Sequence, residues 1–507
     1  MSVTVKLSPR SKTAVTVAVM LAAIMQMLDT TIANVALPHM QGSLSATQDQ
    51  LAWVLTSYIV AAAIMTLPIG WLSGRFGRKN VFVISTVGFT LASLLCGIAT
   101  SLNEMIAFRI LQGLFGASMV PLSQAIMLDI NPKESHGRAM ALWAVSVMIG
   151  PILGPTLGGF LTEYYSWRWV FYINLPFGAV VLFIVLTLMP ETEREDRRFD
   201  ALGFFALATF IACIQLILDR GHQLDWLDSM EIQLYCALVL SALWVYVIHT
   251  KTTTNPFLTG AIFNDRNFLT SLIFMFFIGL ILLATMALLP TYLQNIMGFP
   301  IFDVGNILAP RGFGTMISMF ILGKVADRFD PRGLVLFGLL LTAYSLALMC
   351  EFNTFVPARI IVITGIMQGF GLGFVFMPLS TLAYLTLDAK YRAEAAGLFS
   401  LVRNLGSSIG VSIAFSLFAR NLQTQHAYLS ENITPYSMAI GIQQLPQVLN
   451  NEATAALMLL DAEINRQAAT IAYLNDFKLM MWVVLAMLPM VLLLRRPPTT
   501  SDNSVQA

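Results

Sequence analysis

An aspartate, Asp29, lies inside an otherwise apolar stretch of the chain. The residues before it include TAVTVAVMLAAI, and the stretch continues as MQMLDTTIANVALPHM. A charge at the middle of a bilayer costs at least about 3 kcal/mol on insertion scales, so such a residue usually has a task. A carboxyl group placed there can take up and release a proton, which would couple the protein to an ion gradient. The alternative is structural, with Asp29 paired to an arginine that locks two helices together.

Arg109, in the segment FRILQG, is the natural partner of Asp29. At 1.5 Å per residue, Asp29 lies roughly 13 Å from the outer end of its helix, and Arg109 roughly 9 Å from the outer end of its own. Their side chains are long enough to bridge this difference in depth, so we expect an ion pair. Protonation or arrival of a substrate would loosen the pair and give it two states. The alternative for Arg109 is a side chain that reaches out to the membrane surface.

A polar wedge surrounds Asp29 on its helix. Gln26 and Thr30 share one helical face with Asp29, and Asn34 lies at its edge, so this face can point to a cavity. Gln112 follows Arg109 on the other helix. We therefore expect these four neighbours to line a substrate cavity.

Two arginines in the second part of the chain also lie near the middles of apolar helices. Arg311 and Arg403 are roughly 14–15 Å from the nearest helix end. Neither has an acidic partner at matching depth in the sequence. They either bind an anionic group of a substrate, as further cavity residues, or cap helix carbonyls.

The segment AVSVMIGPILGPTLGGFL carries a ladder of glycines and two prolines. Gly150, Gly154 and Gly158 are four residues apart, which gives a smooth helix face for close packing. Prolines at positions 151 and 155 remove backbone hydrogen bonds and bend the helix. This combination suits a surface against which the other half of the protein rocks, and the alternative is ordinary helix packing. The full motif is Gly150, Pro151, Gly154, Pro155, Gly158 and Gly159.

The elements that carry these residues are membrane helices. Of the 507 residues, 57% are hydrophobic and only 11% are charged, against about 25% charged in a typical soluble protein. Apolar windows long enough to span a bilayer predict an all-α polytopic membrane protein with fourteen transmembrane helices. They lie near 13–37, 50–72, 80–100, 104–127, 138–161, 168–189, 200–218, 229–249, 267–289, 302–323, 332–350, 356–385, 393–418 and 475–495.

Lysine and arginine fall mainly in alternate loops. Because cytoplasmic loops are enriched in these residues, the pattern places both termini in the cytoplasm. The near-zero net charge, +1, argues against nucleic acid as a partner. The lipid bilayer is the predicted environment.

The chain repeats itself at an offset near 255 residues. GWLSGRFGRK is echoed by GKVADRFDPR, and QGLFGASMVPLS by QGFGLGFVFMPLS. Two halves of six helices with two helices between them (6+2+6) follow, with cargo expected at the midplane between the halves. The predicted boundaries are 1–12 for a cytoplasmic N-terminus, 13–190 for the first bundle, 198–250 for two linking helices, 265–495 for the second bundle with a 419–474 external loop, and 496–507 for a cytoplasmic tail.

Enzymatic motifs are absent from the sequence. There is no phosphate-binding loop of the form GxxxxGK[ST], and the five histidines have no metal-ligand spacing. We therefore predict neither an enzyme nor a metal or organic cofactor, with the proton as coupling ion. A membrane sensor or an enzyme subunit is the competing class, and the lack of a catalytic constellation argues against it.

Several motifs together resemble the drug:proton antiporters of the major facilitator superfamily. They are LDTTIANVALP, GWLSGRFGRK, the R-x-x-Q-G of Arg109–Gly113 and GPILGPTLGG. With fourteen spans and WRWVFYINLPFG, the chain is similar to the EmrB/QacA group, nearer its EmrB side. The resemblance implies the major facilitator fold and proton-driven export of hydrophobic drugs, with Asp29 and Arg109 at functional positions. It also implies a bacterial inner membrane, a periplasmic EmrA-type adaptor and an outer-membrane channel.

One loop departs from the family pattern. Gly74 stands where the loop after the second span usually has an aspartate, which places the cytoplasmic latch of that half in doubt. Asp129 can replace the missing partner by pairing with Arg75 or Arg78. The expected cytoplasmic gating residues are Gly70, Arg75, Gly77, Arg78, Asp129, Asp327 and Arg328.

The sequence leaves two interpretations of the transport function open. The first is multidrug efflux, and the second is export of an endogenous metabolite, a siderophore or a fatty acid on the same fold. The segment 419–474 contacts an adaptor, gates the cavity, or is a solvated connector. We expect side chains such as Met275, Phe276, Phe277 and Met286 to line the cavity. They would suit many apolar molecules, so the sequence leaves the substrate open.

Overall fold

The computed structural model is helical throughout the parts of the chain that it describes. These are residues 8–46, 48–132, 135–191, 194, 198–221, 224–253, 256–258, 260–325, 329–385, 387, 391–431 and 453–494. The α-helices are α1 (Pro9–Ser43), α2 (Gln48–Thr66), α3 (Ile69–Phe76), α4 (Arg78–Ile98), α5 (Leu102–Gly116), α6 (Met119–Asp129), α7 (His136–Tyr164), α8 (Trp169–Tyr172), α9 (Asn174–Leu188), α10 (Ala201–Arg220), α11 (Met230–Thr252), α12 (Gly260–Phe263), α13 (Arg266–Asn295), α14 (Ile301–Val325), α15 (Pro331–Met349), α16 (Ala358–Leu385), α17 (Arg392–Glu431) and α18 (Ala453–Met487). Two short 3-10 helices, η2 (Trp226–Asp228) and η6 (Pro489–Leu493), complete the set of regular elements used below.

The predicted spans coincide with helices. By length and apolar composition, 11 helices of the described residues could cross a membrane, or up to 12 when α2 and α3, bent by 56°, count as one span. The two predicted spans outside this count, 138–161 and 302–323, are α7 and α14. The prediction of an all-helical, multi-pass membrane protein is therefore confirmed.

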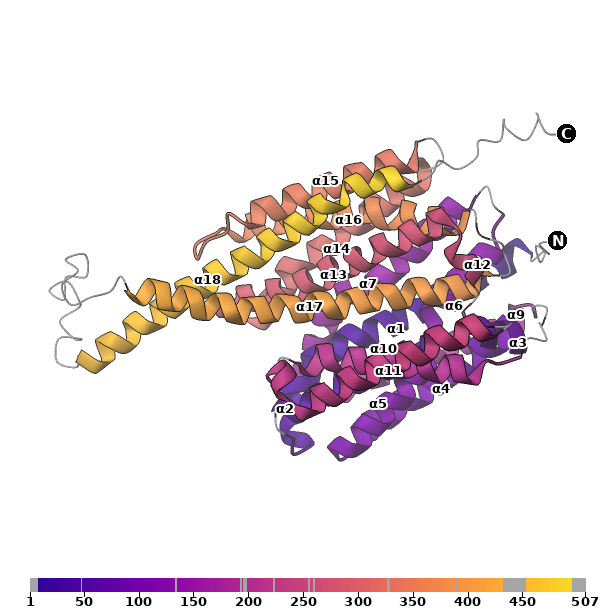
Figure 1. Ribbon diagram of the computed structural model, residues 1–507, viewed down its shortest axis with the longest axis horizontal. Coiled ribbons are helices and arrows are strands. Elements are labelled where there is room, and N and C mark those ends of the chain that lie inside the picture. Colours follow the sequence, from indigo (N-terminus) through magenta and orange to yellow (C-terminus); the bar gives the residue numbers. More distant parts are fainter. Residues whose placement is uncertain are drawn as a thin grey trace.

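The two halves repeat the same packing pattern. In the first half, α1 packs on α7, and α5 packs on both α2 and α4. In the second half, α13 packs on α17, and α16 packs on both α14 and α15. Figure 1 shows the two groups side by side, with α10 and α11 beside the first. This correspondence is the structural counterpart of the sequence repeat.

The ends of the bundle differ in shape. The last turns of α17 and the first turns of α18 project well beyond the other helices (Figure 1, left). We call this the hairpin end, and the opposite end, where α1 begins, the base end. A polar contact between His426 Nε2 and Asp461 Oδ1, 3.1 Å apart, joins the two projecting helices.

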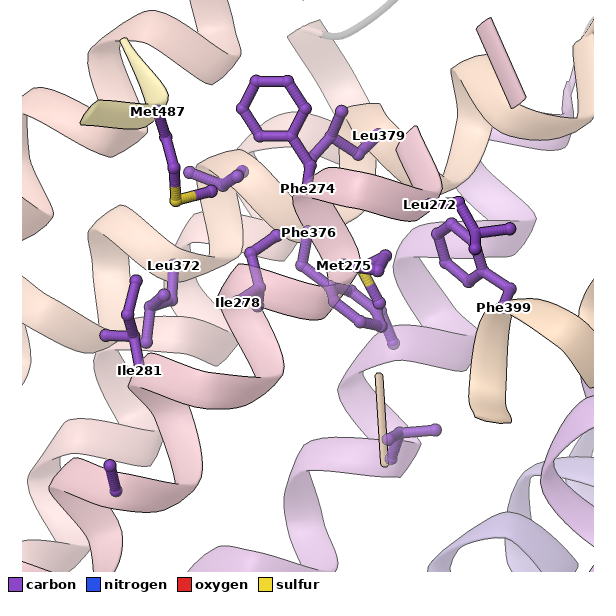
Figure 2. Packing of buried hydrophobic residues seen from close by; sticks show 14 of the residues in the cluster. Leu272, Phe274, Met275, Ile278, Ile281, Leu372, Phe376, Leu379, Phe399 and Met487 are labelled. Atoms are coloured by element: carbon purple, nitrogen blue, oxygen red, sulfur yellow. The ribbon is translucent and has the colours of Figure 1, made fainter. Parts of the chain in front are cut away.

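The largest apolar core lies mainly in the second half. Leu272, Met275 and Ile278 of α13 belong to it, together with Leu372 and Phe376 of α16 (Figure 2). The sequence suggested Met275 as a cavity residue, which is wrong, because this side chain is completely buried in the core. Helical periodicity identifies a face of α13 but not the helix that covers it.

The linking helices lie at the edge of the bundle. α10 and α11 pack on each other, and α10 also contacts α2 and α17, one helix from each half. Only 11% of the most apolar window of α11 is buried. A helix that is apolar all round and so exposed fits a lipid-facing position.

Candidate functional site

Asp29 and Arg109 meet inside the first half. Both side chains have 0% exposed surface, and Arg109 Nη1 donates to Asp29 Oδ2 over 2.8 Å. The predicted pairing is therefore confirmed. The alternative in which Arg109 reaches the membrane surface is wrong, because the guanidinium is completely enclosed between helices. The role of the pair in proton coupling stays a prediction.

Two amide side chains complete the shell around the carboxylate. Gln112 Nε2 donates to Asp29 Oδ1 over 2.8 Å, and Asn174 Nδ2 donates to the same oxygen over 3.0 Å. Gln112 Oε1 in turn accepts from Arg109 Nη1 at 2.8 Å. Ser93 Oγ accepts from both amides, over 2.7 and 3.2 Å. The charge of Asp29 is thus compensated by one cation and two N–H donors, as a buried carboxylate requires.

Arg109 is held by backbone and aromatic groups as well. Its Nε donates to the carbonyl of Val54 on α2 over 3.0 Å. Its guanidinium carbon lies 4.6 Å from the ring centre of Tyr58 and 5.4 Å from that of Phe171. Such cation–π contacts stabilise a desolvated guanidinium. The ion pair therefore links α1, α2, α5 and α8 in one network.

Asn174 was missed in the sequence prediction. It begins α9 and lies within WRWVFYINLPFG, the motif that helped to identify the family. An uncharged polar residue at the end of an apolar run carries little cost at the membrane surface, so composition does not single it out. Its position directly before the Leu-Pro of this motif was the available signal.

The predicted cavity residues of α1 divide into two groups. Gln26 is buried, and its Oε1 accepts from the backbone N–H of Val120 over 2.9 Å. Gln112 is also fully buried, so neither lines an open space in this structure. Thr30 is partly exposed and Asn34 exposed. The exposed part of the wedge therefore begins one residue beyond Asp29.

The glycine ladder of α7 contacts a different partner from the predicted one. A methyl group on Gly150 would come within 2.5 Å of the Met27 carbonyl carbon, and one on Gly154 would collide with Thr31. Thr31 Oγ1 also donates to the Gly150 carbonyl over 3.1 Å. The ladder is thus the seat of α1 in the same half, which corrects the expectation of a surface for the other half.

The remaining members of this motif have less specific surroundings. α7 runs without interruption through positions 151 and 155, whose side chains lie outside the described set. Gly158 is buried, and its carbonyl accepts from Thr162 Oγ1 over 2.7 Å. Around Gly159 there is open space, because nothing lies within 4 Å of an added methyl group. α7 meets α14 of the other half through a different face, where Ala141 lies against Gly323.

Gly150→Ala is expected to destabilise the protein, and Gly159→Ala is its matched control. The added methyl at 150 overpacks the α1–α7 contact, at an expected cost of about 1–3 kcal/mol. The same change at 159 enters open space and gains up to about 1 kcal/mol of helix propensity. Thermal unfolding of the two purified variants in one detergent measures the difference. Equal melting temperatures would contradict the close α1–α7 contact.

The base-end loops contain the predicted replacement latch. Arg78, at the start of α4, forms an ion pair with Asp129 at the end of α6, which was one of the two alternatives predicted. Gly77 joins α3 to α4 with a φ of 84°, a conformation that favours glycine. Arg75 is exposed in the last turn of α3. Asp327 and Arg328 lie outside the described residues.

The two halves touch each other at the base end. A methyl group on Gly70 would lie 2.8 Å from the Cα atom of Glu394. Tyr384 Oη donates to Gln124 Oε1 over 3.2 Å across the same interface. Nearer the middle, the rings of Trp143 and Phe376 stack with centres 6.1 Å apart. These contacts close the base end in this structure.

Arg311 and Arg403 are both buried in the second half. Arg311 is 8% exposed, and its Nη2 donates to Thr285 Oγ1 over 2.8 Å. Arg403 is 9% exposed, and its Nη2 reaches only the neighbouring Asn404 Oδ1, at 3.5 Å. Among the described residues neither forms a salt bridge or donates to a helix carbonyl. The carbonyl-capping alternative therefore finds no support in the described contacts.

The comparisons with known proteins agree with this architecture. The family model described as Major Facilitator Superfamily matches residues 19–411. The chain is 37% identical over 432 residues to "Multidrug export protein EmrB" of Escherichia coli (strain K12), covering 83% of each chain. It is 33% identical over 497 residues to "Probable multidrug resistance protein EmrY" of the same strain, covering 96% of each. To "Fatty acid resistance protein FarB" of Neisseria gonorrhoeae it is 34% identical over 433 residues, covering 84% of each.

Solved structures support the fold alone. The human organic anion transporter MFSD10 superposes with a TM-score of 0.59 at 15% identity, over 94% of this chain and 100% of that one. The proton:xylose symporter XylE does so with a TM-score of 0.59 at 14% identity, over 95% and 96%. With its two pseudo-symmetric helical halves and these relatives, the chain belongs to the Major Facilitator Superfamily of membrane transporters, in its EmrB-like group.

Proposed function

We propose that this transporter is a proton-coupled multidrug antiporter, which exports hydrophobic and amphipathic compounds by alternating access. The observation that carries the proton coupling is the fully buried carboxylate of Asp29, held by Arg109, Gln112 and Asn174. The names of relatives such as EmrB and EmrY support the export of drugs. The sequence motifs of α1, α5 and α7, which resemble those of drug:proton antiporters, also support this function.

The coupling step is an exchange between two states of the ion pair. While Asp29 is ionised, it joins α1 to α5 through Arg109 Nη1 and to α9 through Asn174. A proton on Asp29 removes the negative charge, so the attraction to Arg109 falls and α1 is free to shift against α5. Release of that proton restores the pair. If one proton enters for each neutral substrate, every 100 mV of membrane potential adds about 2.3 kcal/mol to the drive.

The closed base end supports alternation between two forms. The contacts of Gly70 with Glu394 and of Tyr384 with Gln124 belong to one form and must separate in the other. Thr30 and Asn34 would then line the path that the substrate takes between the halves. In this scheme the Asp29 network changes its packing while the two halves rock.

The proposed location is the inner membrane of a bacterium, with both termini in the cytoplasm. The distribution of lysine and arginine supports this orientation, which makes the base end cytoplasmic. The projecting ends of α17 and α18 would then lie in the periplasm, where an EmrA-type adaptor and an outer-membrane channel would continue the export path.

Efflux from proteoliposomes tests the proposal. Purified protein is reconstituted without any adaptor, a fluorescent hydrophobic dye is loaded, and a pH gradient is imposed across the membrane. We expect dye movement that stops when a protonophore collapses the gradient. Dye movement of equal rate with and without the gradient would sink proton coupling.

Export of an endogenous compound is the second candidate. One relative is a fatty acid resistance protein, and its name favours a fatty acid among the alternatives, which also include a siderophore or another metabolite. A deletion strain separates the two tasks. Drug sensitivity with an unchanged culture medium supports multidrug efflux, and loss of one metabolite from the medium with unchanged drug sensitivity supports the second candidate.

A further inference from the structure

Arg311 is a buried cation that lacks an anion. It lies on α14, one residue after Pro310, and is 8% exposed. Its one hydrogen bond within the described part of the chain goes to Thr285 Oγ1 at 2.8 Å. A guanidinium has five N–H donors and keeps its charge in proteins. Most of the hydrogen-bonding capacity of Arg311 is therefore unused.

The first half shows how the same kind of group is satisfied. There, α5 carries Arg109 and, one turn later, Gln112, which both bind Asp29. The matching helix of the second half, α16, keeps the glutamine as Gln368 but has Gly365 in place of the arginine. Arg311 fills this place from α14, because a methyl group on Gly365 would lie 3.6 Å from the Arg311 Cβ atom. The cation is kept, on a different helix.

The carboxylate, in contrast, has been lost. α13 occupies the place of α1 in the second half, yet it contains no aspartate or glutamate between Arg266 and Asn295. It presents the hydroxyl of Thr285 to the cation instead. Gln368 is completely buried, and neither of its amide atoms has a hydrogen-bond partner among the described residues. Buried amides are nearly always paired, and both amide atoms of Gln368 are available to hydrogen-bond a substrate.

The surroundings of Arg311 suit an anion with an apolar body. Ile307 and Leu308 lie one turn before Arg311 on α14, and Leu282 lies one turn before Thr285 on α13, all partly buried. One guanidinium among such side chains fits a single charge better than a phosphate, which carries two. Guanidinium and carboxylate are also planar and pair through two parallel hydrogen bonds.

We propose that Arg311, assisted by Gln368, binds the carboxylate of an amphipathic monocarboxylate substrate. The substrate thereby supplies the anion that Asp29 supplies in the first half. This inference rests on the proposed export function and narrows its substrate class. Arg311 is a substrate-binding residue in this scheme, and Thr285 Oγ1 accepts one of its hydrogen bonds.

Binding of two matched probes tests the inference. Radiolabelled decanoate and uncharged decanamide have the same chain length, and binding is measured in phosphatidylcholine nanodiscs at neutral pH, with empty nanodiscs subtracted. Hydrogen bonds to a charged group predict a preference for decanoate of about tenfold or more in the wild-type protein. Arg311→Gln is expected to abolish this preference, and Arg311→Lys to keep part of it. Equal binding of both probes by the wild type would overturn the inference.

Thr285→Asp supplies an internal anion and guards against a folding defect in Arg311→Gln. An aspartate at 285 would pair with Arg311 as Asp29 pairs with Arg109, so it should compete with decanoate and remove the preference. The matched variant Thr285→Asn adds no charge and should retain it. The assignment would be overturned if Thr285→Asp retained the preference for decanoate. It would also be overturned if Arg403→Gln removed the preference and Arg311→Gln did not, because the anion site would then lie elsewhere.

Failure of this inference is distinguishable from failure of the proposed function. If the wild-type protein exports an uncharged dye under a pH gradient but shows no preference for decanoate, the proposed antiport function stands and the carboxylate site is refuted. If the protein prefers decanoate but does not move the dye, the carboxylate site stands and proton-driven multidrug export is refuted.

Discussion

Asp29→Asn is expected to abolish proton-driven efflux in a protein that still folds but is less stable, because the buried charge of Arg109 loses its counter-ion. Asparagine has nearly the same volume as aspartate, and its carbonyl oxygen can still accept from Arg109, Gln112 or Asn174. It cannot take up a proton, however, so the exchange between two charge states is lost. We expect at least a tenfold lower initial rate of dye efflux under a pH gradient. Substrate counterflow without a gradient should be reduced much less.

Asp461→Asn is the matched control for this experiment. Asp461 lies on the projecting part of α18 with 62% of its side chain exposed and pairs with His426. Removal of a carboxylate there leaves the interior of the bundle untouched, and its efflux rate should equal that of the wild type in adaptor-free liposomes. Retention of gradient-driven efflux by Asp29→Asn would refute the assignment of Asp29 as the proton carrier.

Arg109→Leu is expected to have the largest effect on stability. Removal of one partner from a fully buried pair leaves an uncompensated charge, which typically costs about 3–5 kcal/mol. The loss also frees Gln112 Oε1 and the Val54 carbonyl from their donor. We expect a strongly lowered melting temperature and a smaller monodisperse fraction in size-exclusion chromatography of the detergent-solubilised protein.

The double variant Asp29→Asn, Arg109→Leu distinguishes the charge from the packing. It removes both charges, so it should regain a large part of the stability lost in Arg109→Leu, without regaining transport. Arg359→Leu, at an exposed arginine near the start of α16, controls for the loss of one positive charge from the chain. A double variant as unstable as the single one would assign the role of Arg109 to its contacts with Tyr58 and Phe171.

The sequence was sufficient for the positions of the helices and for the central contact. Hydropathy reports burial in lipid along each segment, and an intramembrane charge is costly enough to require a partner. The similar depths of the two residues in the membrane were therefore enough to identify Arg109 as the partner of Asp29. The internal repeat has its structural counterpart in the packing of α1 on α7 and of α13 on α17, although the sequence did not predict these helix pairs.

Neighbours across helices could not be predicted so directly. Periodicity shows that Gly150 and Gly154 share a face, but not that α1 rather than the other half covers it. Asn174 and Ser93 are uncharged, so no energetic penalty marked them before their hydrogen bonds were seen. The packing of the helices brings both residues into the Asp29 network from distant parts of the sequence.

The length of α17 has a mechanical consequence. Its 40 residues extend over about 60 Å, roughly twice the thickness of a bilayer core. Inside the bundle, Gly406 and Gly410 fix it closely against α13. A rigid rod held at one end acts as a lever, so a tilt of about 10° at α13 would move a point some 30 Å away by about 5 Å. Small adjustments around the transport path thus become larger displacements at the hairpin end.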